Sequence, residues 1–162
     1  MSYLWRKALA VGGAVAAAAL LVPSPASASP STAFNATFQN TSSVVTASRQ
    51  ADGNTFISEV VQVVYAGDLV GSVVEHADVV IHPDGTLNFS GADVCTCTLT
   101  GTGLSGTIAL PFSATGNASG SVSGRFTFAD GTGGLASLHG VGTFETSNGS
   151  SGPFSGVYHI DP

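Results

Sequence analysis

The sequence has very little positive charge. Its 162 residues contain four lysines and arginines in total, and two of these, Arg6 and Lys7, stand at the extreme N-terminus. The remainder of the chain has no lysine and keeps Arg49 and Arg125 against ten acidic residues, a net charge of about −8 with neutral histidines. Nucleic acids and anionic membranes are bound through clustered cations. The sequence therefore argues against nucleic-acid and membrane partners for the mature chain.

Long hydrophobic runs are also absent, except at the N-terminus. Residues 8–22 are only alanine, valine, leucine and glycine. A run of about 15 residues is shorter than the roughly 20 that span a bilayer as a helix. A basic start, an apolar core and the small residues Ala26 and Ala28 are typical of a bacterial signal peptide. We expect cleavage after Ala28, which would remove residues 1–28 and leave 29–162 as one secreted, extracellular domain.

The chain after residue 30 lacks apolar residues at helical spacing and lacks a fixed repeat period, which argues against a helical domain and against a solenoid. Instead, short alternating segments rich in valine, phenylalanine and isoleucine are separated by glycine, serine and asparagine, a pattern typical of β-strands. The expected strands are 33–38, 43–49, 55–65, 69–81, 86–90, 93–100, 106–112, 119–128, 139–146 and 154–160. Because these exceed eight, some must merge across bulges.

The two longest predicted strands, 55–65 and 69–81, are largely apolar on both faces. That pattern favours a barrel over a sandwich, because one set of side chains can line the interior. The sequence therefore predicts an all-β fold, a single eight-stranded antiparallel up-and-down barrel that follows the signal peptide.

The glycine-bearing turns are similar to those of a known family. GDLVG at 67–71, PDG at 83–85 and GTGGLASLHGVGTF at 131–144 resemble the allene oxide cyclase-type β-barrels, nearest to their bacterial secreted branch, and dirigent proteins share the glycine-rich turn. The resemblance implies an eight-stranded barrel with a cavity, in which plant members cyclise a fatty-acid epoxide. Those members place a glutamate, an asparagine and a cysteine at the ligand. Only the glutamate has candidates here, Glu59 or Glu75, so the catalytic set is not carried over.

Cysteine is limited to Cys95 and Cys97. On a strand, two residues separated by one other share a face, about 6.5 Å apart at Cα, which is within the upper range of a disulfide. Outside the cell, and with no other cysteine as a partner, we expect these two to pair. A redox or soft-metal pair is the alternative, but the sequence places no histidine or cation beside it. We expect no metal site and no cofactor.

Motifs of hydrolases and phosphate-binding loops are missing too. The segment GSVSG at 120–124 lies within a strand pattern rather than on a turn, and no lysine follows the glycines at 131–134. The candidates for acid–base chemistry are therefore Glu59, Glu75 and His76, the last of which shares a strand face with Asp78. The pairs His82–Asp84 and His159–Asp161 fit surface hydrogen bonds better, because one lies in a turn and the other at the chain end.

Several polar side chains stand among valines in the predicted strands, where a purely structural strand would not need them. We expect the barrel to be hollow at one end and to bind a small apolar molecule there, without catalysis. The predicted ligand-binding residues are Tyr65, Val63, Glu75, His76, Arg125 and Tyr158. Two alternatives stay open: an isomerase or cyclase similar to allene oxide cyclase that uses Glu59, Glu75 or His76, and a non-catalytic extracellular structural or interaction protein.

Overall fold

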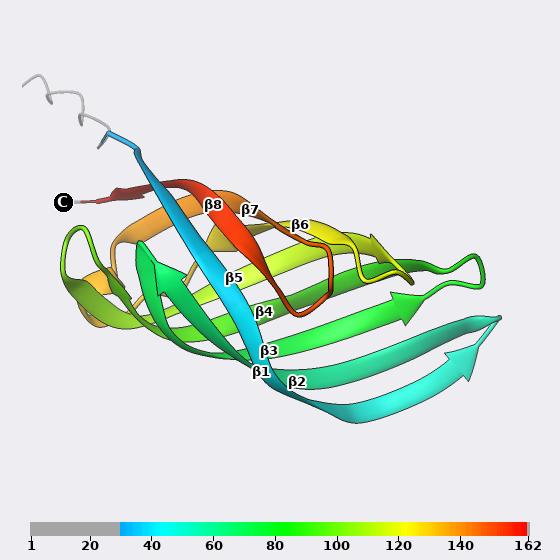
Figure 1. The fold of residues 1–162 in the computed structure, drawn as a ribbon. Helices are drawn as coiled ribbons and strands as arrows, with labels where there is room; N and C mark the ends of the chain where they lie inside the picture. Colours follow the sequence, from blue (N-terminus) through cyan, green and yellow to red (C-terminus); the bar gives the residue numbers. More distant parts are fainter. Residues whose placement is uncertain (1–29, 162) are drawn as a thin grey trace, which may run out of the picture.

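The computed structural model describes residues 30–161, and the signal peptide predicted for residues 1–28 lies outside the described residues. The described chain consists of eight β-strands and one short 3-10 turn. Their bounds are β1 (Thr32–Ala51), β2 (Asn54–Gly67), β3 (Leu69–Ile81), β4 (Thr86–Leu99), β5 (Leu104–Asn117), β6 (Val122–Phe128), η1 (Gly133–Leu135), β7 (Leu138–Thr146) and β8 (Ser151–Ile160). Each strand pairs antiparallel with the next, and β8 returns to β1, so the sheet closes (Figure 1). The predicted all-β, eight-stranded up-and-down barrel is confirmed.

Two pairs of predicted strands merge, and they do so for different reasons. Segments 33–38 and 43–49 form the single strand β1, whose register to β2 shifts between Asn40 and Ser42 and again between Val45 and Ala47. Such bulges bend a strand without ending it. Segments 86–90 and 93–100 form β4, which pairs with β3 and β5 in continuous register. The glycine between them therefore marks close packing and not a break.

The strands differ in length, so the two ends of the barrel differ. The turn between β1 and β2, at Asp52 and Gly53, and the turn between β3 and β4 lie together at the right of Figure 1, and the start of β1 and the end of β8 lie at the left. We call these the turn end and the terminal end. Since β1 pairs with β8 only as far as Gln39 and with β2 as far as Ala51, the β1–β2 hairpin projects beyond the shorter strands at the turn end.

The terminal end is filled by aromatic and aliphatic side chains. Phe34 is 1% exposed and lies at its centre, with ring-centroid distances of 5.4 Å to Phe128, 5.9 Å to Phe154 and 6.3 Å to Tyr158. Aliphatic side chains that are almost fully buried complete the layer, namely Leu69, Leu99, Ile108, Leu135 and Leu138. Because apolar burial is the main favourable term in folding, this end supplies much of the barrel's stability.

Phenylalanine rings inside the barrel pack over glycines of adjacent strands. A Cβ on Gly142 of β7 would collide with the Phe126 ring of β6, and a Cβ on Gly124 of β6 would collide with the Phe144 ring of β7. The registers pair Phe126 with Gly142 and Phe144 with Gly124. The glycines therefore make room for large rings in the narrow interior of an eight-stranded barrel.

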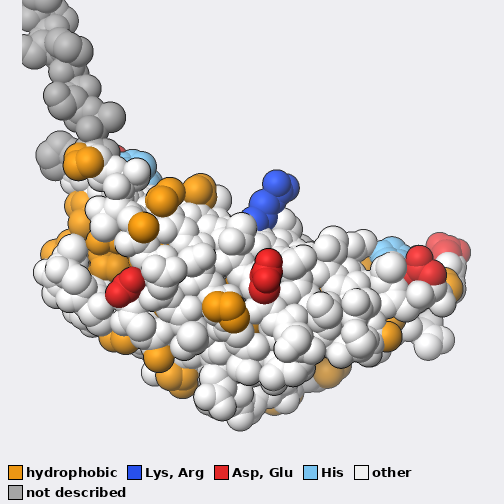
Figure 2. Space-filling view, turned by 45° about the horizontal axis from the view of Figure 1, so that its top comes forward, with side chains coloured by type: hydrophobic (Ala, Val, Ile, Leu, Met, Phe, Trp, Pro, Cys, Tyr) orange, Lys and Arg blue, Asp and Glu red, His pale blue; other side chains and the backbone are white. Residues whose placement is uncertain are grey.

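The outer face carries few charges. Figure 2 shows a surface that is mostly uncharged, with sparse acidic and basic side chains and scattered hydrophobic ones. The exposed hydrophobic side chains are mainly valines, such as Val44 and Val45 on the projecting hairpin and Val141 on β7. Within the described residues no helix is both long and apolar enough to cross a membrane.

Candidate functional site

A cavity of about 180 Å³ occupies the interior toward the turn end and is partly open to solvent. It reaches from the middle of the barrel to Gly120 in the β5–β6 turn and Gly149 in the β7–β8 turn. Most of its wall is apolar, and the lining includes Val63, Phe89, Leu110, Phe112, Phe144 and Phe154. The hollow end expected from the sequence is therefore present in the structure, opposite the filled terminal end.

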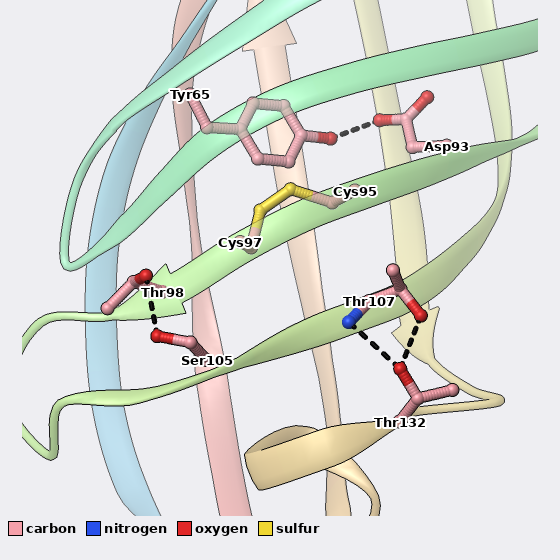
Figure 3. The surroundings of a disulfide bond; sticks show 8 residues. All are labelled: Tyr65, Asp93, Cys95, Cys97, Thr98, Ser105, Thr107 and Thr132. Atoms are coloured by element: carbon pink, nitrogen blue, oxygen red, sulfur yellow. Dashed lines mark hydrogen bonds between the residues drawn. A yellow bond between two sulfur atoms is a disulfide. The ribbon is translucent and has the colours of Figure 1, made fainter.

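Three polar side chains from neighbouring strands meet at the floor of this cavity. Tyr65 comes from β2, Glu75 from β3 and Asp93 from β4, and all three line the cavity. Glu75 and Asp93 are direct partners across the β3–β4 ladder. The Tyr65 hydroxyl donates a hydrogen bond to Oδ2 of Asp93, as Figure 3 shows. We call Tyr65, Glu75 and Asp93 the polar floor.

Burial changes the acidity of each group of the polar floor. It raises the pKa of Glu75 to about 8, and the negative charges of Asp93 and Glu59 add to this shift. Burial also raises the pKa of Asp93 to about 6, against the opposing hydrogen bonds from Tyr65 and Glu75. The pKa of Tyr65 lies well above its usual value because of burial and the nearby charge of Asp93. Near neutral pH, Glu75 is therefore protonated, Asp93 is ionised, and the pair carries about one negative charge.

Two buried oxygen atoms of residues that line the cavity accept no hydrogen bond from an amide or hydroxyl group of the described residues. They are Oδ1 of Asp93 and Oδ1 of Asn40, both fully buried. Asn40 lies at the first bulge of β1, where its backbone amide donates to Ser150 in the β7–β8 turn. Oδ1 of Asn40 can therefore accept a hydrogen bond from a molecule in the cavity, whereas Asp93 has the protonated carboxyl of Glu75 as a neighbouring donor.

The cysteine pair lies next to the polar floor on β4. Cys95 and Cys97 follow Asp93 at alternate positions and share its inward face, with exposures of 0% and 3%. Their Cα atoms are 5.4 Å apart and the sulfurs are joined in a disulfide beside Tyr65 and Asp93 (Figure 3). The bridge stiffens the strand that carries Asp93.

Three of the residues that the sequence nominated lie together at the cavity: Val63, Tyr65 and Glu75. They share the inward face of β2 and β3, where Val63 and Tyr65 are 3% and 5% exposed. Their shared position follows from the two-residue period of a strand.

The other nominated residues are not among those that line the cavity. His76 follows the inward-facing Glu75, and Arg125 precedes the inward-facing Phe126. Both are therefore exposed on the outer face. Tyr158 is buried but belongs to the filled terminal end, near Phe34. Glu59 points its carboxylate to Ser43, whose hydroxyl donates to it at 2.7 Å.

Sequence reasoning missed Asp93 and Asn40. Asp93 was treated only as the first residue of a strand, although its spacing from Cys95, Cys97 and Leu99 places all four on one face. That spacing was the available signal. Asn40 carried no signal, because it lies in the gap between two predicted strands that the structure joins through a bulge.

The remaining histidines make surface contacts. His139 and His159 approach Asp161 at 3.4 Å and 3.5 Å, and all three side chains are exposed. His82 is hydrogen-bonded to Asn54 and Asn88. Within residues 30–161, no cluster of three or more histidine, cysteine or acidic side chains could hold a metal ion.

Comparison with known proteins supports the fold and leaves the activity open. No protein-family model matches the chain, and no curated protein matches it. Among solved structures, it is similar to a protein of unknown function from the DUF3224 family of Shewanella oneidensis MR-1, with 15% identity and a TM-score of 0.63. That match covers 82% of this chain and 99% of the other. At this identity the likeness concerns the fold alone.

Proposed function

We propose that this protein is a secreted binding module that holds one small, largely apolar molecule at the turn end of its barrel. The observation that carries the proposal is a cavity of about 180 Å³ with an apolar wall and a polar floor. Ligand sites combine these two features, because apolar walls supply affinity and a few polar groups fix orientation. Val63 contributes to the wall, and Tyr65 and Glu75 contribute to the floor.

The size of the cavity limits the ligand. A dry engineered cavity of about 150 Å³ binds benzene. A cavity of about 180 Å³ therefore suits one aromatic ring or a short aliphatic chain with a small polar group. A larger molecule would have to project through the open side, between the β5–β6 and β7–β8 turns.

The proposal is tested by titrating the folded protein with toluene and with benzyl alcohol in a calorimeter. We expect one site per chain. Val63→Trp fills the cavity and should abolish binding of both probes, at a cost to stability of less than the 1–3 kcal/mol typical of overpacking a solid core. Val64→Trp is the matched control, because Val64 is the next residue and is 46% exposed on the outer face. It should leave binding unchanged.

Two results would contradict the proposal. One is that the native protein binds no small apolar probe, whether neutral or charged. The other is that Val63→Trp lowers the melting temperature strongly while binding of both probes persists, since the cavity would then not be the binding site.

A second candidate is an isomerase of the allene oxide cyclase type, which the sequence resemblance suggests. Its support is that the pKa of Glu75 is about 8, near the value that suits proton transfer at neutral pH. Phenylacetone in D₂O provides the test, because a base at the cavity floor would accelerate deuterium uptake beside its carbonyl. Wild-type protein should then exceed Glu75→Gln. Equal rates of deuterium uptake for both proteins would rule out the isomerase candidate and leave the binding module as the proposed function.

A further inference from the structure

The polar atoms that the cavity offers to a ligand are hydrogen-bond acceptors. Asp93 accepts from the Tyr65 hydroxyl and from the protonated carboxyl of Glu75, which are both neutral donors, while Oδ1 of Asn40 has no donor among the described residues. A buried acceptor without a donor is unfavourable, because it has lost its hydrogen bonds to water. The partner that best satisfies this cavity is therefore a donor, and Asp93 is an ionised acceptor, which forms stronger hydrogen bonds than a neutral one.

The wall around the polar floor also favours positive charge. Six phenylalanines line the cavity, namely Phe38, Phe89, Phe112, Phe126, Phe144 and Phe154. Aromatic faces carry partial negative charge and attract cations within about 6 Å of the ring centre. Aromatic rings and a carboxylate together form the usual surroundings of an organic ammonium group.

No cation of the described chain neutralises the floor. The cavity lining contains neither arginine nor histidine. Arg49 lies over the Phe56 ring of the projecting hairpin at 3.8 Å from its centroid, and Arg125 is exposed on the outer face of β6. The charge of Glu59 also acts on Glu75 and is negative. The electrostatic field of the floor is therefore uncompensated by the described residues.

We propose that the ligand of this cavity is a small apolar amine, about one aromatic ring in size, whose ammonium group donates to Oδ1 of Asp93. This inference rests on the proposed binding function and names its ligand class. The ring or chain of the amine lies among the phenylalanines, and the ammonium group takes the place of the Glu75 proton as a donor to Asp93. Asn40 presents a second acceptor nearer the turns.

Binding of an amine should change the protonation of Glu75. Near pH 7 Glu75 is protonated because it is buried beside negative charge. An ammonium group at Asp93 would compensate that charge and lower the pKa of Glu75, so amine binding should expel a proton from the floor. A neutral ligand of the same shape should not.

The test compares benzylamine with benzyl alcohol, which differ in the charge of one group. We expect benzylamine to bind about tenfold more tightly or better, since a hydrogen bond to a charged partner contributes more than a neutral one. Asp93→Asn should remove most of the advantage of benzylamine, so that the ratio of the benzylamine affinity to the benzyl alcohol affinity falls to about one. Asp78→Asn is the matched control on the outer face of β3, where Asp78 accepts from Ser58. It should change neither affinity.

A second measurement needs no variant. Calorimetry of wild-type protein with benzylamine in phosphate and in Tris at pH 7 should give different apparent enthalpies, because the released proton is taken up by the buffer. Benzyl alcohol should give the same enthalpy in both.

The outcomes separate the two proposals. If benzyl alcohol or toluene binds and benzylamine binds no more tightly, or releases no proton, the amine inference is wrong and the binding function stands. If none of the three probes binds, the binding function itself is wrong.

Discussion

Glu75 is an acid held in an apolar cavity, so its protonation is coupled to folding. In the unfolded chain its pKa lies near 4.5, and burial raises it to about 8 in the folded protein. Between these values the folded state holds a proton that the unfolded state has lost. The contribution of Glu75 to the free energy of unfolding is therefore greatest below about pH 4.5 and declines as the pH rises toward 8. Asp93, with a pKa of about 6, adds a decline at lower pH.

We expect the free energy of unfolding to fall by on the order of 3 kcal/mol between pH 5 and pH 9. Glu75→Gln mimics the protonated acid, so it should remove the decline above about pH 6 and make the protein more stable than wild type at pH 9. Urea denaturation at several pH values measures this. Glu145→Gln, at an exposed site on β7, is the control and should keep the wild-type profile. A wild-type stability that rises from pH 6 to pH 9 would contradict the assignment.

At the scale of single residues, the sequence predicted only part of the site. Alternation along β2 and β3 was enough to place Val63, Tyr65 and Glu75 on shared faces, because strand periodicity is local. It could not decide which face is the lumen, and so His76 was nominated beside Glu75. The meeting of Glu75 and Asp93 depends on the register of β3 with β4, which is set by packing across the whole sheet.

At the scale of elements, the glycines of β6 and β7 act as packing surfaces for rings. A methyl group at Gly142 would meet the Phe126 ring and the backbone oxygen of Ser155. We expect Gly142→Ala to lower the free energy of unfolding by about 1–3 kcal/mol. Gly101→Ala is the matched control, because nothing lies within 4 Å of the added methyl group there. Thermal unfolding compares the two, and equal melting temperatures would show that the ring has room to move.

The disulfide of β4 provides a second test at this scale. The native protein should contain no free thiol, so a thiol reagent in denaturant should detect none before reduction and two after it. The loop between Cys95 and Cys97 is very short, and its closure restrains the unfolded chain little. We therefore expect reduction to cost about 2 kcal/mol or less, below the usual value for a disulfide. Two thiols without reductant would overturn the pairing.

Strand boundaries show where sequence patterns stop being sufficient. Strands β2 and β3 were predicted within a few residues, because their alternation is long and glycine separates them. In β1 the bulges at Asn40 and Val45 reverse the alternation, and so one strand looked like two. In β4 Gly91 looked like a break, although it lies where a Cβ would collide with His76 and Phe112. A local pattern does not distinguish a glycine that packs from one that turns.

At the scale of the whole molecule, the described barrel begins just after the predicted cleavage site. We expect the exported protein to start at Ser29. Intact mass spectrometry of culture medium measures this directly. A species that retains residues 1–22 outside the cell would contradict the prediction. A variant with Ala28→Leu is the control, since a large residue beside the cleavage site should block processing.

The division of the barrel into a filled end and a hollow end has a consequence for how such a chain can change over generations. Phe34 and the leucines around it hold the strands together, whereas Phe89 or Phe144 border open space. Under the proposed binding function, substitutions of side chains that border this space alter the shape offered to a ligand, whereas substitutions at the filled end remove core contacts. If the barrel binds a ligand as proposed, descendants of one such gene can change that ligand by mutation at one end while selection preserves the other, so ligand preference can diverge faster than the fold.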